Sequence, residues 1–286
     1  MSIIDGRAVA KKIRGDVKSK IAGLGFQPGL AVILIGDNWE SKLYIEQKEI
    51  ACKEVGIQFF LHEFVSSVEI NEVISLIQKL NADRKVQGIL VQLPISVSLD
   101  LIKIQEAIDP WKDVDGFNPI NRGLLFSMAK KASLETMIPC TPAGVMRLLE
   151  EYEVDVNGKN VVVIGRSNII GKPLSYLLLQ KGATVTICHS QTKDLKFHTQ
   201  NADILVCAAG QEALVTAEMV KKGAVVIDVA LNRVTDQSKK GYHIVGDTDF
   251  EKVKSKASLI TPVPGGVGPM TVAMLLQNIL KASLIK

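Results

Sequence analysis

Four short apolar runs in the second half of the chain constrain its fold more than any other feature. They are NVVVIG (160–165), TVTICH (184–189), DILVCAA (203–209) and AVVIDVA (224–230). Successive runs begin about 20 residues apart, which is the spacing of strands separated by single helices. Continuous apolar strands of this kind pair in parallel, with helices covering both faces of the sheet. The spacing therefore predicts a Rossmann-type, doubly wound parallel sheet.

The first half of the chain also alternates between helix and strand. Val9, Ile13, Val17 and Ile21 recur every four residues with Lys and Arg between them, which predicts an amphipathic helix. The pattern then predicts strands at 30–36, 57–61 and 88–94, and helices at about 39–55 and 69–80. We therefore expect an α/β domain in this half as well.

Two further segments bear on the domain organisation. Residues 109–142 hold four prolines and few periodic runs, which predicts an inter-domain connection or a functional loop. After PVPGGVGPMT (262–271) comes a long helix that is apolar on nearly all sides, so it must be buried, and we expect it to pack back against the first domain. We expect residues 1–138 with 269–286 to form one domain and residues 139–268 to form the other.

Composition narrows the class of protein. With 47% hydrophobic and 22% charged residues, the chain can bury a large core. It has no apolar run of the ~18 residues that span a bilayer, and Asp5 interrupts the start of any signal peptide, so we expect a cytoplasmic protein without membrane contact. The net charge of +4 is unclustered, which argues against nucleic acid as a partner. Cysteines and histidines are scattered without metal-ligand spacing, so no metal is expected.

The turn after the run at 160–165 is a candidate phosphate-binding site. Gly165, Arg166 and Ser167 are followed by Gly171, where the next helix is expected to begin. A buried strand that ends in glycine and opens onto a helix is the phosphate-binding turn of dinucleotide folds. The usual G-x-G-x-x-G is absent, and the guanidinium of Arg166 would face the ribose and phosphates. The alternative is an ordinary strand–turn–helix connection.

Ser41, Tyr44 and Lys48 are spaced at i, i+3 and i+7, so they share one face of the predicted helix 39–55. A partly desolvated lysine beside a tyrosine has a lowered pKa and can act as an acid or base. The alternative is a solvated helix face.

Three further segments contain residues that could bind a ligand. Gln92 lies at the end of the apolar strand 88–94, where α/β folds bind their ligands, although it could equally satisfy nearby loop backbone. Asp113 and Asp115 precede a glycine in KDVDGFNP, but the rest of a calcium-binding loop is missing. They could form a turn or bind a heterocycle that presents adjacent N–H donors. The Gly/Pro-rich run 262–271 could admit a ligand or act as a hinge.

Taken together, these segments resemble one family. SxxYxxxK, GILVQLP, KDVDGF, PCTPxG, VVVIGRSxxxGxP, CHSxT and PVPGGVGPMT occur in its order and spacing, from about residue 3 to 281. The chain is similar to bifunctional methylenetetrahydrofolate dehydrogenase/methenyltetrahydrofolate cyclohydrolases. The resemblance implies NADP-dependent oxidation of 5,10-methylenetetrahydrofolate, followed by hydrolysis to 10-formyltetrahydrofolate. It also implies a folate-binding first domain, an NADP-binding second domain, an active-site cleft between them and a homodimer formed mainly through the nucleotide domains.

The resemblance also assigns the site residues. Lys48, Gln92 and Tyr44 would be catalytic, and Tyr44, Ser41, Asp115 and Gln92 would bind the folate. The cofactor would contact Gly165, Arg166, Ser167, Ser190 and Leu231. The chain departs from the usual pattern at Ala230, where glycine is common, at Leu231 (isoleucine), at Ser96 (proline) and at Asn118 (histidine). None of these changes removes a residue with a chemical role.

The sequence favours NADP over NAD and one function over its alternatives. NAD-specific folds place a carboxylate at the end of the second strand, whereas TVTICHSQT ends without one, so NADP is expected. The alternatives are a dehydrogenase-only enzyme of the same family, a non-catalytic folate- or nucleotide-binding regulator, and a shikimate- or quinate-type dehydrogenase. Retention of Lys48 and Gln92 argues against the first two, and the DVDG and VQLP matches argue against the third.

Overall fold

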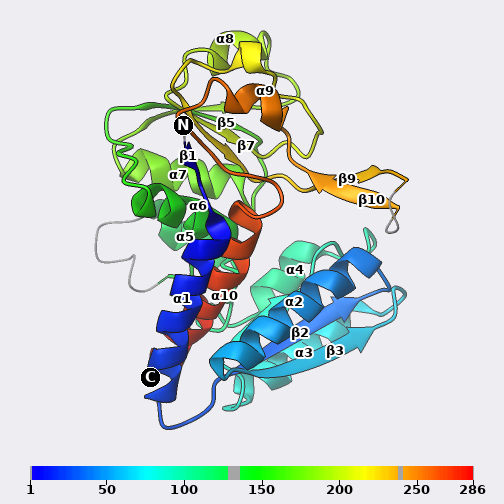
Figure 1. Ribbon diagram of the computed structural model, residues 1–286. Helices are drawn as coiled ribbons and strands as arrows, with labels where there is room; N and C mark the ends of the chain where they lie inside the picture. The colour runs from blue at the N-terminus through cyan, green and yellow to red at the C-terminus, as the bar shows by residue number, and fades with distance from the viewer. Residues whose placement is uncertain (1, 128–135, 238–240, 286) are drawn as a thin grey trace. The chain divides into compact units, whose positions relative to one another are not determined.

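The computed structural model describes residues 2–127, 136–237 and 241–285 (Figure 1). The chain divides into two compact units. Unit 1 comprises Met1–Ala10 and Thr141–Thr271, and unit 2 comprises Lys11–Cys140 and Val272–Lys286. Within the described residues, no helix is both long and apolar enough to cross a membrane.

Unit 1 is built on a parallel sheet of six strands in the order β1-β11-β8-β7-β5-β6. The strands are β1 (Ser2–Ile3), β5 (Asn160–Ile164), β6 (Thr184–Cys188), β7 (Ile204–Cys207), β8 (Val225–Asp228) and β11 (Leu259–Ile260). Every neighbouring pair is parallel, and the four predicted apolar runs are β5 to β8. The predicted doubly wound parallel sheet is therefore confirmed.

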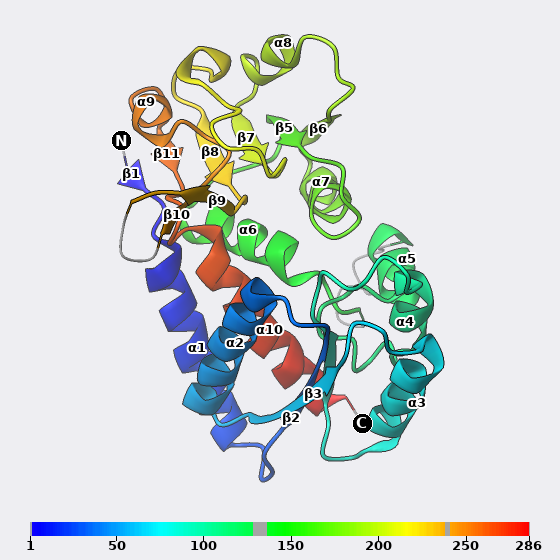
Figure 2. The same ribbon diagram turned by 90° about the vertical axis from the view of Figure 1, so that its right-hand side faces the viewer.

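Helices cover both faces of this sheet. They are α6 (Cys140–Glu151), α7 (Gly171–Gln180), α8 (Leu195–Thr199) and α9 (Phe250–Lys254), with a short 3-10 helix at Ala217–Met219. Figures 1 and 2 show α6 and α7 on one face and α8 and α9 on the other. Because β5 lies between β6 and β7, the chain leaves β5 toward one side and later returns on the other. Sheets of this type bind ligands at the carboxyl ends of the strands on either side of such a reversal, which here are β5 and β7.

The two-residue strands β1 and β11 and a hairpin in unit 1 were not predicted. The two-residue strand β1 pairs with β11, so the packing groups the first ten residues with unit 1, whereas the sequence placed them with the first half. A hairpin of β9 (Asn232–Thr235) and β10 (Tyr242–Val245) follows β8. A two-residue strand is too short to carry a periodic signal, and the hairpin strands are only partly buried.

Unit 2 contains a parallel sheet of three strands in the order β3-β2-β4. The strands are β2 (Gly29–Ile35), β3 (Gln58–Phe64) and β4 (Gly88–Val91). The helices are α1 (Gly6–Ala22), α2 (Trp39–Val55), α3 (Ile70–Ala82), α4 (Leu101–Ala107), α5 (Pro119–Ser127) and α10 (Val267–Leu284), of which α1 and α10 continue from unit 1. Both faces of β2 are buried, and the face that carries Ala31, Ile33 and Ile35 packs against α3 and α4. The predicted strands and helices of the first half are confirmed, although β4 ends at Val91 rather than at residue 94, and α4 and α5 were not predicted.

The prediction of a connection over residues 109–142 is wrong in one respect. The segment contains helix α5, and α6 begins within it at Cys140. Pro119 is the first residue of α5 and Pro142 lies in the first turn of α6, where a proline needs no hydrogen bond from its nitrogen. Prolines at these positions start helices rather than exclude them. Residues 128–135 of the segment lie outside the described residues.

The closing helix α10 is buried, as its sequence predicts. Ala273, Leu275, Leu276 and Ile279 are each at most 1% exposed. Beyond residue 271 the helix packs with the first half of the chain, since Asn278 Nδ2 donates to the carbonyl oxygens of Val114 (2.8 Å) and Ile138 (3.0 Å).

Candidate functional site

The polar centre of unit 2 is a contact between Lys48 and Gln92. Lys48 lies on α2 and Gln92 directly follows β4. Lys48 Nζ donates a 2.8 Å hydrogen bond to Gln92 Oε1. Gln92 Nε2 donates to the carbonyl oxygen of Leu93 at 2.8 Å, and this second contact turns the amide oxygen toward the lysine. Gln92 is 8% exposed, so its side chain is held in this orientation.

The environment of Lys48 favours the neutral amine. Burial lowers the pKa of Lys48, while the charge of Asp115 opposes that change and raises it. Conversely, burial raises the pKa of Asp115, and Lys48 lowers it. A lysine whose pKa is lowered holds its proton less tightly, which suits a group that accepts a proton and returns it. The site therefore has the chemistry of an acid/base catalyst.

Ser41 and Tyr44 share the helix with Lys48 but differ in exposure. Tyr44 is 39% exposed and stands one turn from Lys48, so its ring can contact a planar ligand. Ser41 is 1% exposed. Its amide donates to Asn38 Oδ1 at the start of α2, and its hydroxyl lies 3.5 Å from the carbonyl oxygen of Leu93. Ser41 thus lies beneath the 92–94 loop rather than at an open surface.

The two aspartates of the DVDG segment have different surroundings. Asp113 is 2% exposed and its Oδ2 accepts from Asn118 N (2.7 Å) and Asn121 Nδ2 (2.8 Å). Burial raises the pKa of Asp113 to about 6. Asp115 is partly exposed and interacts with Lys48. Asp113 therefore fixes the conformation of the DVDG segment through buried hydrogen bonds, while Asp115 is available to a ligand.

Asn278 lies beneath this loop and was missed by the sequence analysis. Besides its bonds to Val114 and Ile138, its Nδ2 lies 3.7 Å from Cys140 Sγ. The thiol of Cys140 donates to the carbonyl oxygen of Val114 at 3.3 Å. The available signal was an asparagine in an otherwise apolar helix, because such a residue must find buried partners.

The glycine turn of unit 1 is packed closely against neighbouring backbone, which only glycine permits at two of its positions. Gly165 has φ +134°, and a Cβ there would collide with the carbonyl oxygen of Ala208. A Cβ at Gly171 would collide with the carbonyl oxygen of Gly165. Ser167 Oγ accepts from the amides of Ile170 (3.1 Å) and Gly171 (3.3 Å), which orders the start of α7. A helix that starts behind a glycine turn in this way suits the diphosphate of a dinucleotide.

The remaining expected cofactor residues surround this turn. Arg166 is exposed, and its Nη2 lies 3.5 Å from Gln191 Oε1 in the loop after β6. Ser190 precedes Gln191 and is also exposed, so an arginine and a hydroxyl lie together without a carboxylate between them. Leu231 follows β8 and is 43% exposed. These residues fit a dinucleotide with an additional phosphate on its ribose.

Two buried carboxylates at the same edge of the sheet were also missed. Asp228 ends β8 and is 1% exposed, and Asp247 is 0% exposed. Burial raises the pKa of Asp228. The sequence signal for Asp228 was an aspartate within the otherwise apolar run 224–230, and that run was interpreted only as a strand.

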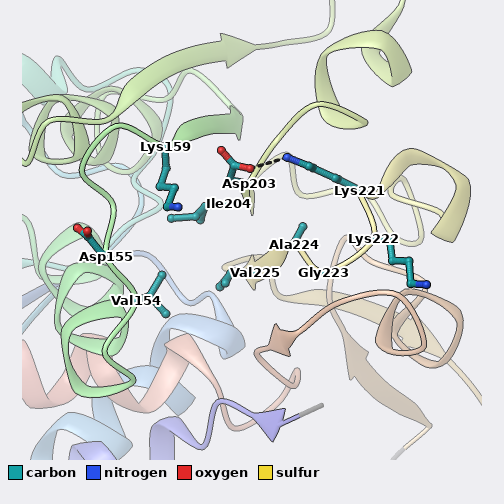
Figure 3. Close-up of a pocket in the computed structure, with 10 residues that line it drawn as sticks. All are labelled: Val154, Asp155, Lys159, Asp203, Ile204, Lys221, Lys222, Gly223, Ala224 and Val225. Carbon is teal, nitrogen blue, oxygen red and sulfur yellow. Dashed lines mark hydrogen bonds and ion pairs between the residues drawn. The ribbon is translucent and has the colours of Figure 1, made fainter.

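A separate cavity of about 330 Å³ opens at the amino ends of β5, β7 and β8 (Figure 3). It is lined by Val154, Asp155, Lys159, Asp203, Ile204, Lys221, Lys222, Gly223, Ala224 and Val225. Lys221 pairs with Asp203 at 2.6 Å, as Figure 3 shows. None of the expected site residues lines it. Over the part of the chain that the structure describes, no group of three or more His, Cys, Asp or Glu residues is arranged to hold a metal ion.

Comparison with protein-family models gives two matches that together cover most of the chain. Residues 4–115 match the catalytic domain of tetrahydrofolate dehydrogenase/cyclohydrolase, and residues 139–286 match its NAD(P)-binding domain. Among curated relatives, the bifunctional protein FolD of Nautilia profundicola is 49% identical over 99% of this chain and 97% of its own length.

Solved structures give the same result. The bifunctional FolD methylenetetrahydrofolate dehydrogenase/cyclohydrolase of Campylobacter jejuni has a TM-score of 0.94 and is 47% identical, covering 99% of this chain and 98% of its own. The Trypanosoma brucei methylenetetrahydrofolate dehydrogenase-cyclohydrolase, solved with NADP and an inhibitor, has a TM-score of 0.93 and is 38% identical. It covers 99% of this chain and 97% of its own.

Proposed function

This chain belongs to the tetrahydrofolate dehydrogenase/cyclohydrolase family, and on that premise we propose how its residues carry out two consecutive reactions. The enzyme oxidises 5,10-methylenetetrahydrofolate to 5,10-methenyltetrahydrofolate with NADP, and hydrolyses the product to 10-formyltetrahydrofolate. The observation that carries the residue assignment is the hydrogen bond between Lys48 and Gln92 beside Asp115.

Asp115 and Tyr44 bind the folate. A reduced pterin presents a ring N–H beside an amino group, and the carboxylate of Asp115 can accept from both. Tyr44 offers a partly exposed ring against which the pterin and the adjoining benzoyl group can pack. Ser41 supports the folate site from below the 92–94 loop. Its hydroxyl lies against the carbonyl oxygen of Leu93, to which Gln92 also donates.

Oxidation requires mainly correct placement of the substrate. When bound, NADP would supply the acceptor for a hydride from the methylene carbon between N5 and N10. The substrate loses no proton in this step, because the positive charge is delocalised over the two nitrogens. Asp115 and Tyr44 therefore contribute by orientation, which can lower the barrier substantially without acid/base chemistry.

Hydrolysis requires proton transfers, and Lys48 supplies them. Water adds to the methenyl carbon while neutral Lys48 accepts one of its protons. Lys48 then returns that proton to N5 as the bond between the carbon and N5 breaks. The remaining hydroxyl proton leaves to solvent, and the formyl group stays on N10. Gln92 holds the amine in place without adding a charge that would keep it protonated.

Residues Gly165, Arg166, Ser167, Ser190 and Leu231 hold the cofactor. The glycine turn and the start of α7 receive the diphosphate, and Arg166 with Ser190 binds the 2′-phosphate. Unit 1 is the NADP-binding domain, expected at residues 139–268, and unit 2 is the folate-binding catalytic domain, expected at residues 1–138 with 269–286, although the first ten residues pack with unit 1.

The enzyme acts as a homodimer in the cytoplasm. Strand β6 ends the sheet of unit 1, and Ile187 on it and Leu179 on α7 are 39% and 55% exposed. Exposed apolar side chains beside an unpaired strand edge favour association with a second copy.

All four cysteines are free and buried, which fits a reducing compartment such as the cytoplasm.

A spectrophotometric assay tests the proposed function. Purified protein receives methylenetetrahydrofolate with NADP or NAD, and the near-ultraviolet absorbance of methenyltetrahydrofolate is followed as it forms and decays. We expect NADP-dependent formation and enzyme-dependent decay. Formation without accelerated decay would identify a dehydrogenase-only enzyme, and neither reaction would identify a binding protein.

A further inference from the structure

The buried carboxylate of Asp247 joins two loops at the carboxyl edge of the sheet in unit 1. Its Oδ2 accepts from the amides of Ala209 (2.6 Å) and Gly210 (3.2 Å). Its Oδ1 accepts from the amide of Gln211 (2.7 Å) and from Asn232 Nδ2 (3.0 Å). A fully buried carboxylate with four donors in two different loops determines how those loops lie.

Asp228 fixes the backbone at Asp247 by accepting hydrogen bonds from it. Asp228 Oδ1 accepts from the amides of Asp247 (3.1 Å) and Ala230 (3.2 Å). Its Oδ2 accepts from the amide and the hydroxyl of Thr248, each at 2.8 Å. The loop after β7, the loop after β8 and the base of the β9–β10 hairpin are therefore held by one hydrogen-bonded network.

These loops lie where the second half of the dinucleotide must extend. Arg166 and Ser190 lie at the ends of β5 and β6, so the 2′-phosphate and its adenosine belong on that side of the sheet. The strand order β6-β5-β7-β8 leaves the ends of β7 and β8 for the nicotinamide half. The loop after β7 also abuts the glycine turn, because Ala208 O would meet a Cβ at Gly165.

We propose that Asp247 is a positioning residue for the nicotinamide half of NADP. It holds residues 209–211 and the 230–232 segment, which includes Leu231, in the arrangement that binds this half of the cofactor. The inference rests on the proposed use of NADP and concerns a residue to which no cofactor role has been assigned. Asp247 itself is buried and acts through the backbone amides that it binds.

Binding of two ligands to the intact protein tests the proposal. Asp247→Asn keeps the size of the side chain but replaces one acceptor oxygen with an amino group that faces N–H donors. We expect its Kd for NADP, measured by calorimetry, to rise at least about tenfold, because bonds to a charged acceptor are lost. The Kd for 2′,5′-ADP, which carries only the adenosine half, should stay within about twofold. Hydrolysis of supplied methenyltetrahydrofolate should also persist, since its proposed catalytic residues lie in unit 2.

Two further variants complete the experiment. Asp249→Asn is the matched control, because the carboxylate of Asp249 pairs with Lys252 at 2.8 Å, and its contact with the loop after β7 is made by the backbone amide, which the substitution keeps. It should bind NADP as the wild type does. Asn232→Ala removes one of the four donors. It should weaken the binding of NADP but not of 2′,5′-ADP, and by less than Asp247→Asn does. This variant keeps the proposal testable if Asp247→Asn does not fold.

Three results would overturn the proposal. They are unchanged NADP affinity in Asp247→Asn, equal loss of NADP and 2′,5′-ADP binding, and, if Asp247→Asn does not fold, unchanged NADP affinity in Asn232→Ala. A wild-type protein that binds neither ligand would instead contradict the proposed function.

Discussion

Lys48 and Gln92 are 44 positions apart in the chain, yet Lys48 Nζ donates to Gln92 Oε1 at 2.8 Å. An amide oxygen can accept from an ammonium group and from a neutral amine, and it carries no net charge, so the contact orients the lysine while favouring its protonated form less than a carboxylate would. A carboxylate in the same place would hold the lysine protonated. The pair therefore suits a group that must accept a proton and then return it.

Replacing Lys48 by methionine should separate the two reactions. Hydrolysis needs a proton acceptor and donor, and positioned acid/base groups typically contribute about 10²–10⁴-fold. We expect Lys48→Met to lose most cyclohydrolase activity while keeping a larger fraction of dehydrogenase activity, so that methenyltetrahydrofolate accumulates. Absorbance of that intermediate provides the measurement. Equal loss of both activities would indicate a binding or structural role, and normal hydrolysis would exclude Lys48 as the acid/base.

Changing Gln92 to glutamate should shift the pH dependence of hydrolysis. Burial lowers the pKa of Lys48, which shifts its titration toward lower pH. A carboxylate at hydrogen-bond distance raises a lysine pKa by roughly one unit or more. Since hydrolysis requires the neutral amine, the rise of activity with pH should move about one unit or more upward in Gln92→Glu. Gln92→Met serves as the uncharged control and should lower the rate without this upward shift. An unshifted profile in the glutamate variant would argue against neutral Lys48 as the base.

Arg166 should determine the preference for NADP. A charge-assisted contact to the 2′-phosphate contributes about 1.5–3 kcal/mol, so we expect at least about a tenfold advantage of NADP over NAD in kcat/KM. Arg166→Ala should reduce this ratio mainly by weakening NADP use. Lys159→Ala is the control, because this lysine lies at the opposite edge of the sheet, at the cavity in Figure 3. Equal efficiencies in the wild type, or equal weakening of both cofactors in Arg166→Ala, would contradict the assignment.

Asp115 and Asp113 should differ in the kind of defect that they cause. Asp115→Ala should weaken folate binding and impair both reactions, with little change in thermal stability. Asp113→Ala should lower stability by about 1–3 kcal/mol, because it leaves the buried donors of Asn118 and Asn121 without their acceptor. Thermal unfolding and substrate KM values of the two variants provide the comparison. If Asp113→Ala proved stable but raised the folate KM more than Asp115→Ala, the ligand-binding carboxylate would be Asp113.

Asp113 should also make stability depend on pH. Its pKa is raised to about 6 in the folded protein, so the folded state favours the protonated carboxyl. The resulting stabilisation is fully present below the unfolded pKa near 4 and is lost as pH rises through about 6. Over that range the free energy of unfolding of the wild type should fall by up to about 3 kcal/mol relative to that of Asp113→Asn. Urea unfolding of both proteins at several pH values measures this difference, and parallel curves would contradict it.

The sequence by itself determined the seven strands from β2 to β8, their parallel pairing and the main helices. Burial on both faces of a parallel sheet imposes continuous apolar runs, and the helices between them impose the spacing of about 20 residues. Motif order was enough to place Gly165, Arg166 and Ser167 at the end of the first strand of the nucleotide-binding sheet. It also placed Lys48 and Tyr44 on one helix, because residues near one another in sequence take their geometry from local structure.

Only the tertiary structure decided which polar groups meet. The orientation of Gln92 toward Lys48, the burial of Ser41 and the separate surroundings of Asp113 and Asp115 depend on segments brought together by packing. The same holds for Asp247, whose partners at 209–211 are more than 30 positions away. Hydrogen bonds form only within narrow limits of distance and angle, and no periodic pattern in a sequence encodes those limits.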